Sequence, residues 1–336
     1  MPTVGLDVIL NDARNRKYAV GGFAISNLDF IDCLVDSAIE ENSPIILQLA
    51  EAHFKYLGLE KIVPAILNVA RNVNIPICIH LDHGQSLKTV IKAIRAGFNS
   101  VMFDGSHSSF DENIRLTKEV VSIAHAAGIS VEGEIGYIGG ESAGFNVKST
   151  YVPKKENFTK VEEAYRFARE TKVDALAISV GNAHGFYKDK PNLDFERIAE
   201  IQKAIDVPLV LHGGSGISEE NFKKAIQVGI CKINYYTDMS VVAVNKLRDF
   251  LALNQDFNSY PDLIKIAMAE VKNHLKEIMK IFGSSNKFAS DKTTCFLCNE
   301  GSCSFINPEL APSNNILIYS DLIEKISSEV IKCIKK

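Results

Sequence analysis

The chain lacks several features that would assign it to other protein classes. Among its 336 residues there is no long uncharged apolar run, so no membrane-spanning helix is expected. Its first residues have neither the basic nor the apolar region of a signal peptide. A formal net charge of -4 argues against nucleic acid as the main partner. We therefore expect a cytoplasmic protein, and its seven cysteines are interpreted as reduced thiols.

Apolar, β-branched runs alternate with amphipathic helical segments along the chain. Such alternation predicts a parallel sheet with helices packed on it. A count of eight runs favours closure into a (β/α)8 TIM barrel of the α/β class. An open doubly wound sheet is the alternative, although no Gly-rich dinucleotide-binding loop follows the first run. The runs are Tyr18–Ile25, Pro44–Leu49, Pro76–Asp82, Ser100–Asp104, Ser130–Ile135, Ala175–Gly181, Pro208–His212 and Ile230–Tyr235.

The barrel is expected to occupy residues 1–285, and its last helix is predicted over Tyr260–Phe282. Residues 286–336 are predicted to form a polar linker followed by a terminal helix, Ile316–Ile334. The linker contains three cysteines, whose spacing is compatible with metal binding or redox exchange. Because a structural zinc site needs four ligands, we interpret this segment as a reduced extension. Its cysteines are Cys295, Cys298 and Cys303.

Three histidine motifs follow three of the apolar runs. They are His80–Gly84, Gly181–Gly185 with His184, and His212–Gly216. The carboxyl ends of barrel strands meet at one face of the barrel, so these histidines can converge there. Three imidazoles with a fourth position open are typical of a catalytic metal site. The sequence therefore predicts a metalloenzyme.

Charged side chains are also expected to point into the barrel. Strand side chains alternate, so those two residues apart share a face. Buried carboxylates are costly unless they are paired or bound to a metal. Lys232 could neutralise one carboxylate and a metal another, or these groups could form a purely structural ion network. His80 is interpreted as a hydrogen-bonded interior residue. The inward polar set is His80, Asp82, Asp104, Glu132, Glu134, Lys232 and Asn234.

Two further segments indicate a phosphate site. Gly213–Gly216 lies between the seventh strand and a helix, and residues 234–237 follow the eighth strand. Barrel enzymes often bind phosphate at this position, on backbone N–H groups and a helix N-terminus. Lys188, shortly after His184, could add a cation.

Taken in order, these motifs resemble those of the class II (metal-dependent) ketose-bisphosphate aldolases, which include fructose- and tagatose-bisphosphate aldolases. The resemblance covers roughly the first 285 residues. It rests on His80–Gly84, Asp104–His107, Asp111–Asn113, Glu132–Gly136, Gly181–Gly185, His212–Gly216 and Lys232–Asn234.

The resemblance implies a catalytic zinc held by His83, His184 and His212. It implies that Asp82 handles the proton of the substrate's C4 hydroxyl. It also implies that Asp104 and Glu134 belong to a second metal position, or to the place where zinc rests between turnovers. It also implies a monovalent cation, Na⁺ or K⁺, at carbonyl groups near Val180 and Gly213, and assembly into a homodimer or homotetramer. The residues implied to bind the sugar phosphate are Gly185, Lys188, Gly213, Ser215, Asn234, Tyr236 and Thr237.

In the family, a second acid/base stands on the loop after the fifth strand. Here Tyr137–Phe158 is a long segment of the kind that often forms a lid or binding loop. The family pattern has one more residue before its glutamate, and Glu141 is the candidate available in this chain.

Two positions differ from those of fructose-type members. Tyr236 stands where those members carry an Asp, and Met268 where a late helix supplies an Arg for the distal phosphate. This difference favours a substrate other than fructose 1,6-bisphosphate, for example one without the distal phosphate. Alternatively, Lys265 or a residue of another subunit takes over that role.

The resemblance implies an aldolase of carbohydrate metabolism that reversibly cleaves a ketose (bis)phosphate to dihydroxyacetone phosphate and an aldehyde. Zinc would act as a Lewis acid for the negative charge of the enediolate. Two alternatives stay open: a Schiff-base aldolase that uses Lys232, and a catalytically silent barrel that binds sugar phosphates.

Overall fold

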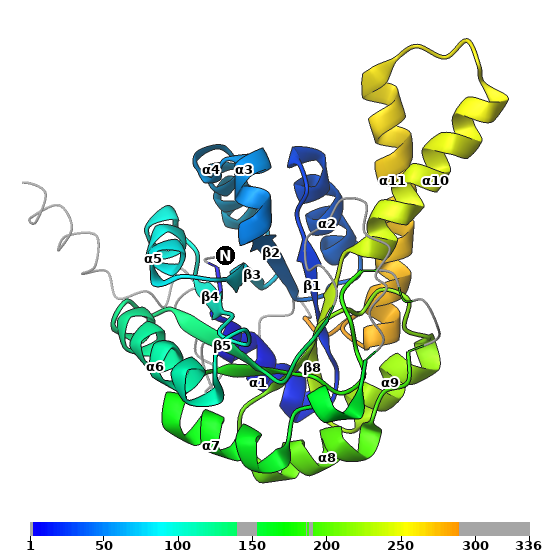
Figure 1. Ribbon diagram of the computed structural model, residues 1–336. Coiled ribbons are helices and arrows are strands. Elements are labelled where there is room, and N and C mark those ends of the chain that lie inside the picture. Colours follow the sequence, from blue (N-terminus) through cyan, green and yellow to red (C-terminus); the bar gives the residue numbers. More distant parts are fainter. Residues whose placement is uncertain (1–2, 140–152, 186, 188–190, 289–336) are drawn as a thin grey trace, which may run out of the picture. The chain divides into compact units, whose positions relative to one another are not determined.

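The protein is a closed barrel of eight parallel strands in the order β1 to β8 (Figure 1). The computed structural model describes residues 3–139, 153–185, 187 and 191–288. The closed barrel confirms the (β/α)8 prediction and excludes the open sheet. Its strands are β1 Val20–Ala24, β2 Ile45–Ala50, β3 Ile77–Gly84, β4 Ser100–Phe103, β5 Ser130–Ile135, β6 Ala175–Ile178, β7 Leu209–Leu211 and β8 Ile230–Tyr235.

Helices lie outside the strands in alternation with them (Figure 1). Because the strands are covered on both faces, every strand residue is buried, which explains why they read as continuous apolar runs. The helices are α1 Leu6–Arg16, α2 Leu28–Glu40, α3 Phe54–Leu57, α4 Leu59–Arg71, α5 Leu87–Ala96, α6 Phe110–Ala126, α7 Val161–Thr171, α8 Phe195–Ala204, α9 Glu219–Gln227, α10 Thr237–Leu253 and α11 Tyr260–Phe282, with short 3₁₀ turns η1 Glu51–His53 and η2 Lys155–Asn157.

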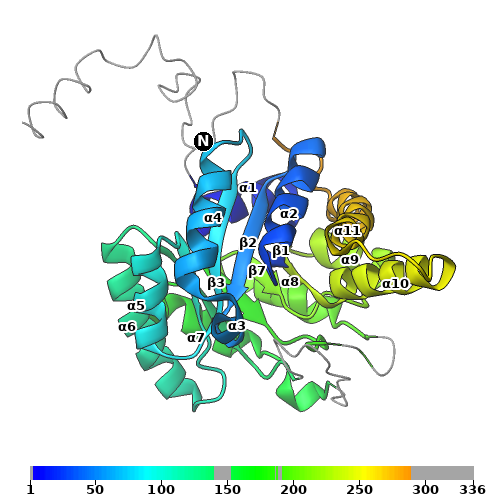
Figure 2. The same cartoon turned by 90° about the horizontal axis from the view of Figure 1, so that it is seen from above.

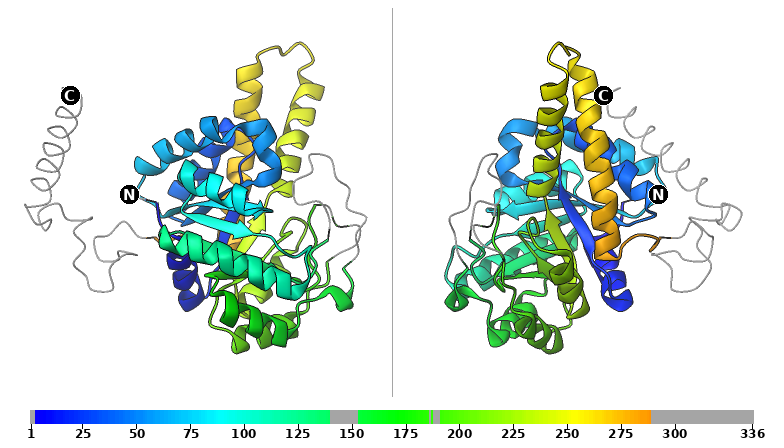
Figure 3. Two further views of the ribbon diagram at one scale, coloured as in Figure 1. Left: turned by 60° about the vertical axis from the view of Figure 1, so that its left-hand side comes forward. Right: turned by 90° about the vertical axis from the view of Figure 1, so that its right-hand side faces the viewer.

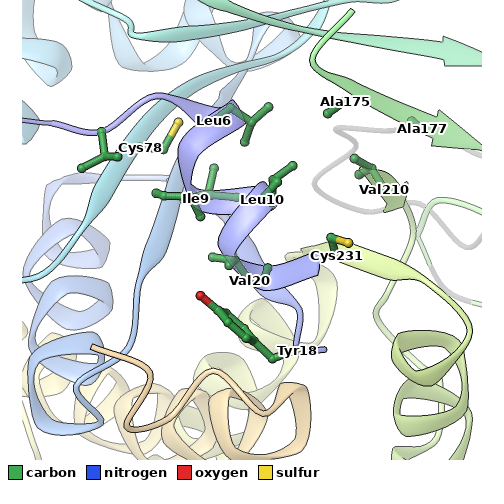
Figure 4. Close-up of a cluster of buried hydrophobic side chains, with 13 residues drawn as sticks. Leu6, Ile9, Leu10, Tyr18, Val20, Cys78, Ala175, Ala177, Val210 and Cys231 are labelled. Carbon is green, nitrogen blue, oxygen red and sulfur yellow. The ribbon is translucent and has the colours of Figure 1, made fainter. Parts of the chain in front are cut away.

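Helix α1 closes the amino end of the barrel. Leu6, Ile9 and Leu10 are fully buried and pack over the first residues of several strands, among them Val20 and Cys78 (Figure 4). Burying such side chains contributes about 1.5–3 kcal/mol each. With this end filled by apolar side chains, the polar interior residues gather at the opposite, carboxyl end.

Helices α10 and α11 form an antiparallel hairpin that projects beyond the barrel (Figures 2 and 3). Helix α11 has the predicted bounds and packs against α2 and α9. Within α10 only Met239 and Ala243 are buried. Large apolar side chains therefore stay exposed on the hairpin: Val244, Leu251, Leu253 and Tyr260.

In the described part of the chain, no helix has the length and apolar character needed to cross a membrane. Cys33, Cys78 and Cys231 are buried free thiols. The predicted terminal helix Ile316–Ile334 and the cysteines Cys295, Cys298 and Cys303 lie outside the described residues. The proposed boundary between the barrel and residues 286–336 stays a prediction.

Candidate active site

A distortion at the end of β3 brings two adjacent residues into the barrel mouth. Successive strand residues normally point to opposite faces. Here the pairing of β3 with β4 shifts register between Leu81 and Gly84, and His83 has a left-handed backbone with φ 47°. As a result Asp82 and His83 both reach the site, with an oxygen of Asp82 3.9 Å from His83 Nε2. The strand also continues to Gly84, two residues beyond the predicted end of the run at Asp82.

His83, His184 and His212 converge and are called the histidine triangle below. His83 Nε2 lies 3.2 Å from His184 Nε2 and 3.2 Å from His212 Nδ1, and the last two atoms are 3.4 Å apart. A tetrahedral zinc with Zn–N bonds of about 2.0–2.1 Å would separate its nitrogens by about 3.3–3.4 Å. All three side chains are buried. The donor type and the spacing therefore fit a divalent ion with one position left for substrate.

The opposite ring nitrogens of two of these histidines face carboxylates. His83 Nδ1 is 2.9 Å from Asp104 Oδ2, and His212 Nε2 is 2.9 Å from Glu132 Oε1. Asp104 is fixed in turn by the backbone N–H and hydroxyl of Ser106, at 3.1 and 2.6 Å. A ring N–H that donates to a carboxylate leaves the other nitrogen bare, which is how metal-binding histidines are oriented.

A second group of possible metal ligands shares His83 with the triangle. Single ligand atoms of His83, Asp104 and Glu134 all lie within 4.8 Å of one another, and Glu134 Oε2 is 3.4 Å from His212 Nδ1. Burial and the nearby Asp104 carboxylate raise the pKa of Glu134 well above its ordinary value. A bound cation would offset the negative charge of these two neighbouring carboxyl groups.

Two amide side chains hold the carboxylate of Asp82. Gln48 Nε2 donates to Oδ2 at 3.2 Å, and Asn234 Nδ2 donates to Oδ1 at 3.1 Å. Burial opposes ionisation of Asp82, yet the neighbouring His83, His212 and Lys232 hold its pKa below the ordinary value. Asp82 is therefore an ionised carboxylate held in place by two amide donors. Gln48 was not identified from sequence, although a polar residue within the apolar run Pro44–Leu49 is a usable signal.

Beneath the triangle lies a layer of buried polar groups. Lys232 Nζ is 2.7 Å from Glu132 Oε2, while His80 Nδ1 is 2.8 Å from Ser100 Oγ. Burial and the Lys232 charge lower the pKa of His80 to about 3, so it is a neutral interior residue, in agreement with the sequence interpretation. Glu132 and Lys232 form the expected ion pair, whereas Glu134 faces the histidines.

The loops after β6 and β7 approach each other closely. Gly213 has φ 63°, and a Cβ there would overlap the carbonyl oxygen of Ala183, so glycine is required. Tyr187 ties the two loops together, since its hydroxyl donates to Gly213 O at 2.8 Å and accepts from Ala183 N at 2.9 Å. Gly185, with φ 79°, follows His184 directly.

The loop after β7 also meets the start of α10. Ser215 Oγ accepts from Asp238 N at 3.1 Å, and Thr237 is the first residue of α10. Tyr236 immediately precedes this helix, and its ring centroid lies 5.7 Å from that of His53, at the end of η1. The glycine-rich loop and the helix N-terminus predicted to bind phosphate are thus adjacent. Two predicted residues, Lys188 and Glu141, lie outside the described residues.

Comparison with known proteins agrees with this arrangement. Residues 4–287 match the family model "Fructose-bisphosphate aldolase class-II". A Bacillus subtilis (strain 168) protein described as a probable fructose-bisphosphate aldolase is 38% identical over 290 residues, which cover 85% of this chain and 100% of that protein. A Staphylococcus aureus (strain Mu50) fructose-bisphosphate aldolase is also 38% identical over 290 residues, covering 85% of this chain and 99% of its own.

The crystal structure of the YdjI aldolase from Escherichia coli K12 superposes with a TM-score of 0.76 at 33% identity, covering 85% of this chain and 100% of that one. The family match, the relatives and the closed barrel with its converging histidines agree. The chain therefore belongs to the class II fructose-bisphosphate aldolase family and is a metal-dependent aldolase, a lyase of carbon–carbon bonds.

Proposed function

We propose that the protein is a zinc-dependent aldolase that reversibly cleaves a ketose phosphate to dihydroxyacetone phosphate and an aldehyde. The observation that carries this proposal is the spacing of 3.2–3.4 Å between one nitrogen of each residue in the histidine triangle. His83, His184 and His212 would hold the zinc, with Asp104 and Glu134 at a second metal position. When bound, zinc supplies Lewis-acid stabilisation of the charge that develops on the dihydroxyacetone phosphate half.

Asp82 is the proposed base for the C4 hydroxyl. Its oxygens are fixed by Gln48 and Asn234, and its lowered pKa keeps it ionised and able to accept a proton. Glu141 is the proposed second acid/base, on the strength of the sequence motif. Lys232 is not proposed as a Schiff-base nucleophile, because its nitrogen forms a buried ion pair and Schiff-base formation needs a free amine.

The sugar phosphate is proposed to lie across the ends of β6, β7 and β8. Support comes from the junction of the Gly213–Gly216 loop with the start of α10, where backbone N–H groups and the helix dipole favour an anion. A monovalent cation, Na⁺ or K⁺, is proposed at the carbonyl groups near Val180 and Gly213. The proposed substrate-binding residues are Gly185, Lys188, Gly213, Ser215, Asn234, Tyr236 and Thr237.

A substrate without a distal phosphate is expected to be preferred. Tyr236 places an aromatic ring against His53 at the barrel mouth, and Lys265 is an exposed residue 3.4 Å from Asp262. Release of dihydroxyacetone phosphate should be measured from fructose 1,6-bisphosphate, tagatose 1,6-bisphosphate and a series of ketose 1-phosphates. We expect the highest kcat/KM with a ketose 1-phosphate.

The Bacillus subtilis and Staphylococcus aureus relatives favour the opposite result, because they are described as a probable fructose-bisphosphate aldolase and a fructose-bisphosphate aldolase. If fructose 1,6-bisphosphate is the best substrate, the interpretation of Tyr236 and Met268 is wrong. If none is cleaved by a protein shown to contain zinc, the catalytically silent binder is the better description.

A homodimer or homotetramer is proposed, and the α10–α11 hairpin is the surface that supports it. Leu253 and Tyr260 are 85% and 71% exposed there, and apolar patches of this kind often mark interfaces. We expect Leu253→Asp with Tyr260→Asp to reduce the mass measured by light scattering after gel filtration. Tyr165→Asp, an exposed aromatic on α7, is the matched control. A wild-type monomer would contradict the proposal.

The cytoplasm is the proposed location. The buried, unpaired thiols of Cys33, Cys78 and Cys231 are what a reducing compartment allows.

A further inference from the structure

A chain of buried polar contacts leads from Lys232 on β8 to His212 after β7. Lys232 Nζ is 2.7 Å from Glu132 Oε2, and Glu132 Oε1 is 2.9 Å from His212 Nε2. All three residues are 0% exposed. These contacts begin at Lys232, which has no assigned role in the proposed cleavage reaction. They end at His212, a member of the histidine triangle.

The charges fix the direction of each hydrogen bond. Lys232 Nζ, which can only donate, lies 2.7 Å from Glu132 Oε2 with both side chains buried, and a buried ammonium in this position is paired with an ionised carboxylate. An ionised carboxylate can only accept, so His212 Nε2 carries the proton and donates it. In a neutral imidazole the other nitrogen, Nδ1, is then bare. It is Nδ1 that faces His83 and His184 in the triangle.

A second partner competes for the same carboxylate. His80 Nε2 lies 3.4 Å from Glu132 Oε2, the oxygen that Lys232 occupies at 2.7 Å. By holding Oε2, Lys232 leaves Oε1 directed at His212. Gly22 on β1 provides the room, because a Cβ at that position would lie 3.1 Å from Lys232 Cε.

We propose that Lys232 is a positioning residue that, by holding Glu132 Oε2, fixes His212 in the tautomer that presents Nδ1 to the metal. This proposal depends on one part of the proposed function, namely that the histidine triangle binds the metal. It gives Lys232 a role as a fixed donor and charge, acting through Glu132 rather than on the substrate.

Glu132→Gln provides the first half of the test. The Lys232 ammonium can only donate, so it would draw the new amide oxygen toward itself and turn the NH₂ group toward His212 Nε2. That nitrogen would have to accept, and the proton would move to Nδ1, where it blocks the metal. We expect Zn²⁺ and Co²⁺ to bind about 10- to 100-fold more weakly, as when other residues that hydrogen-bond to a metal ligand are replaced. Competition with a chelating dye measures these dissociation constants without reference to activity.

Glu132→Gln combined with Lys232→Met provides the second half. Without the ammonium, the amide oxygen is free to accept from His212 Nε2 while its NH₂ group donates to His80 Nε2. We expect the double variant to bind Co²⁺ about tenfold more tightly than Glu132→Gln alone, with a visible spectrum like that of the wild type. Lys223→Met, which removes an exposed lysine paired with Glu219, is the matched control and should change nothing.

A buried ammonium left without its counter-charge also destabilises the fold, so a purely structural role for Lys232 predicts that the double variant regains melting temperature but not the wild-type Co²⁺ spectrum. Equal or weaker affinity of the double variant would overturn the proposal, and so would unchanged affinity of Glu132→Gln. Glu132→Gln leaves the Lys232 ammonium buried without a counter-charge, so the melting temperatures of both variants are measured beside their metal affinities to separate a loss of stability from a change of tautomer. A wild-type protein that binds neither metal would instead refute the proposed function itself.

Discussion

Asp82→Ala is expected to lower kcat by about 10²- to 10⁴-fold, the usual contribution of a general base. The carboxylate is held from both sides by Gln48 and Asn234, and its pKa is lowered, so it is prepared to accept the C4 hydroxyl proton. Metal content should be unchanged, because Asp82 is not part of the histidine triangle. Steady-state kinetics and metal analysis of the same preparation measure both quantities.

Asp82→Asn adds a closer comparison, since it preserves the shape of the side chain but cannot act as a base. A similar loss in both variants would assign the effect to proton transfer rather than packing. Asp111→Ala, at an exposed residue of α6, is the control for removal of a carboxylate. Activity of Asp82→Ala close to that of the wild type would show that another group takes the proton.

His184→Ala is expected to remove one of three metal ligands and, with it, nearly all activity. Structural zinc sites of four ligands contribute about 10–16 kcal/mol, or roughly 3–4 kcal/mol per ligand, so affinity should fall by about 10²- to 10³-fold. Chelator competition measures the affinity, and cleavage assays over a range of added zinc measure the activity. We expect excess zinc to restore activity only in part.

His125→Ala is the matched histidine control. Its ring contacts Asp174 at 2.8 Å on the outside of the barrel, far from the chemistry proposed here, and metal binding should not change. If His184→Ala bound zinc as tightly as the wild type, the histidine triangle would not be the metal site.

The barrel could be predicted from sequence because its determinants are local. Strands covered on both faces need largely apolar runs such as Pro44–Leu49, and several of the helices between them begin at a capping side chain. At α6, for example, Ser109 Oγ accepts from Glu112 N and the helix begins at Phe110. The histidines could be placed together because the carboxyl ends of barrel strands share one face. Helix α1, however, was not identified, since an isolated amphipathic segment does not reveal which end of a barrel it covers.

The finer arrangement of the site depends on contacts between strands that no local pattern encodes. Strand alternation places Asp82 and His83 on opposite faces, and only the register shift against β4 turns both inward. Likewise, Glu132 and Glu134 share a face, yet one pairs with Lys232 and the other meets His212. Which carboxylate is neutralised by lysine is decided by β8, about a hundred residues away in sequence.

Titration of the metal-stripped protein with zinc shows whether cleavage depends on metal bound at the histidine triangle. Release of dihydroxyacetone phosphate from the best substrate should be followed as zinc is added after complete removal of metal by a chelator. We expect no cleavage without metal and recovery in proportion to zinc bound at the histidine triangle, and no recovery in His184→Ala at the stoichiometric zinc levels that restore the wild type. Full activity in the metal-free protein would contradict this expectation.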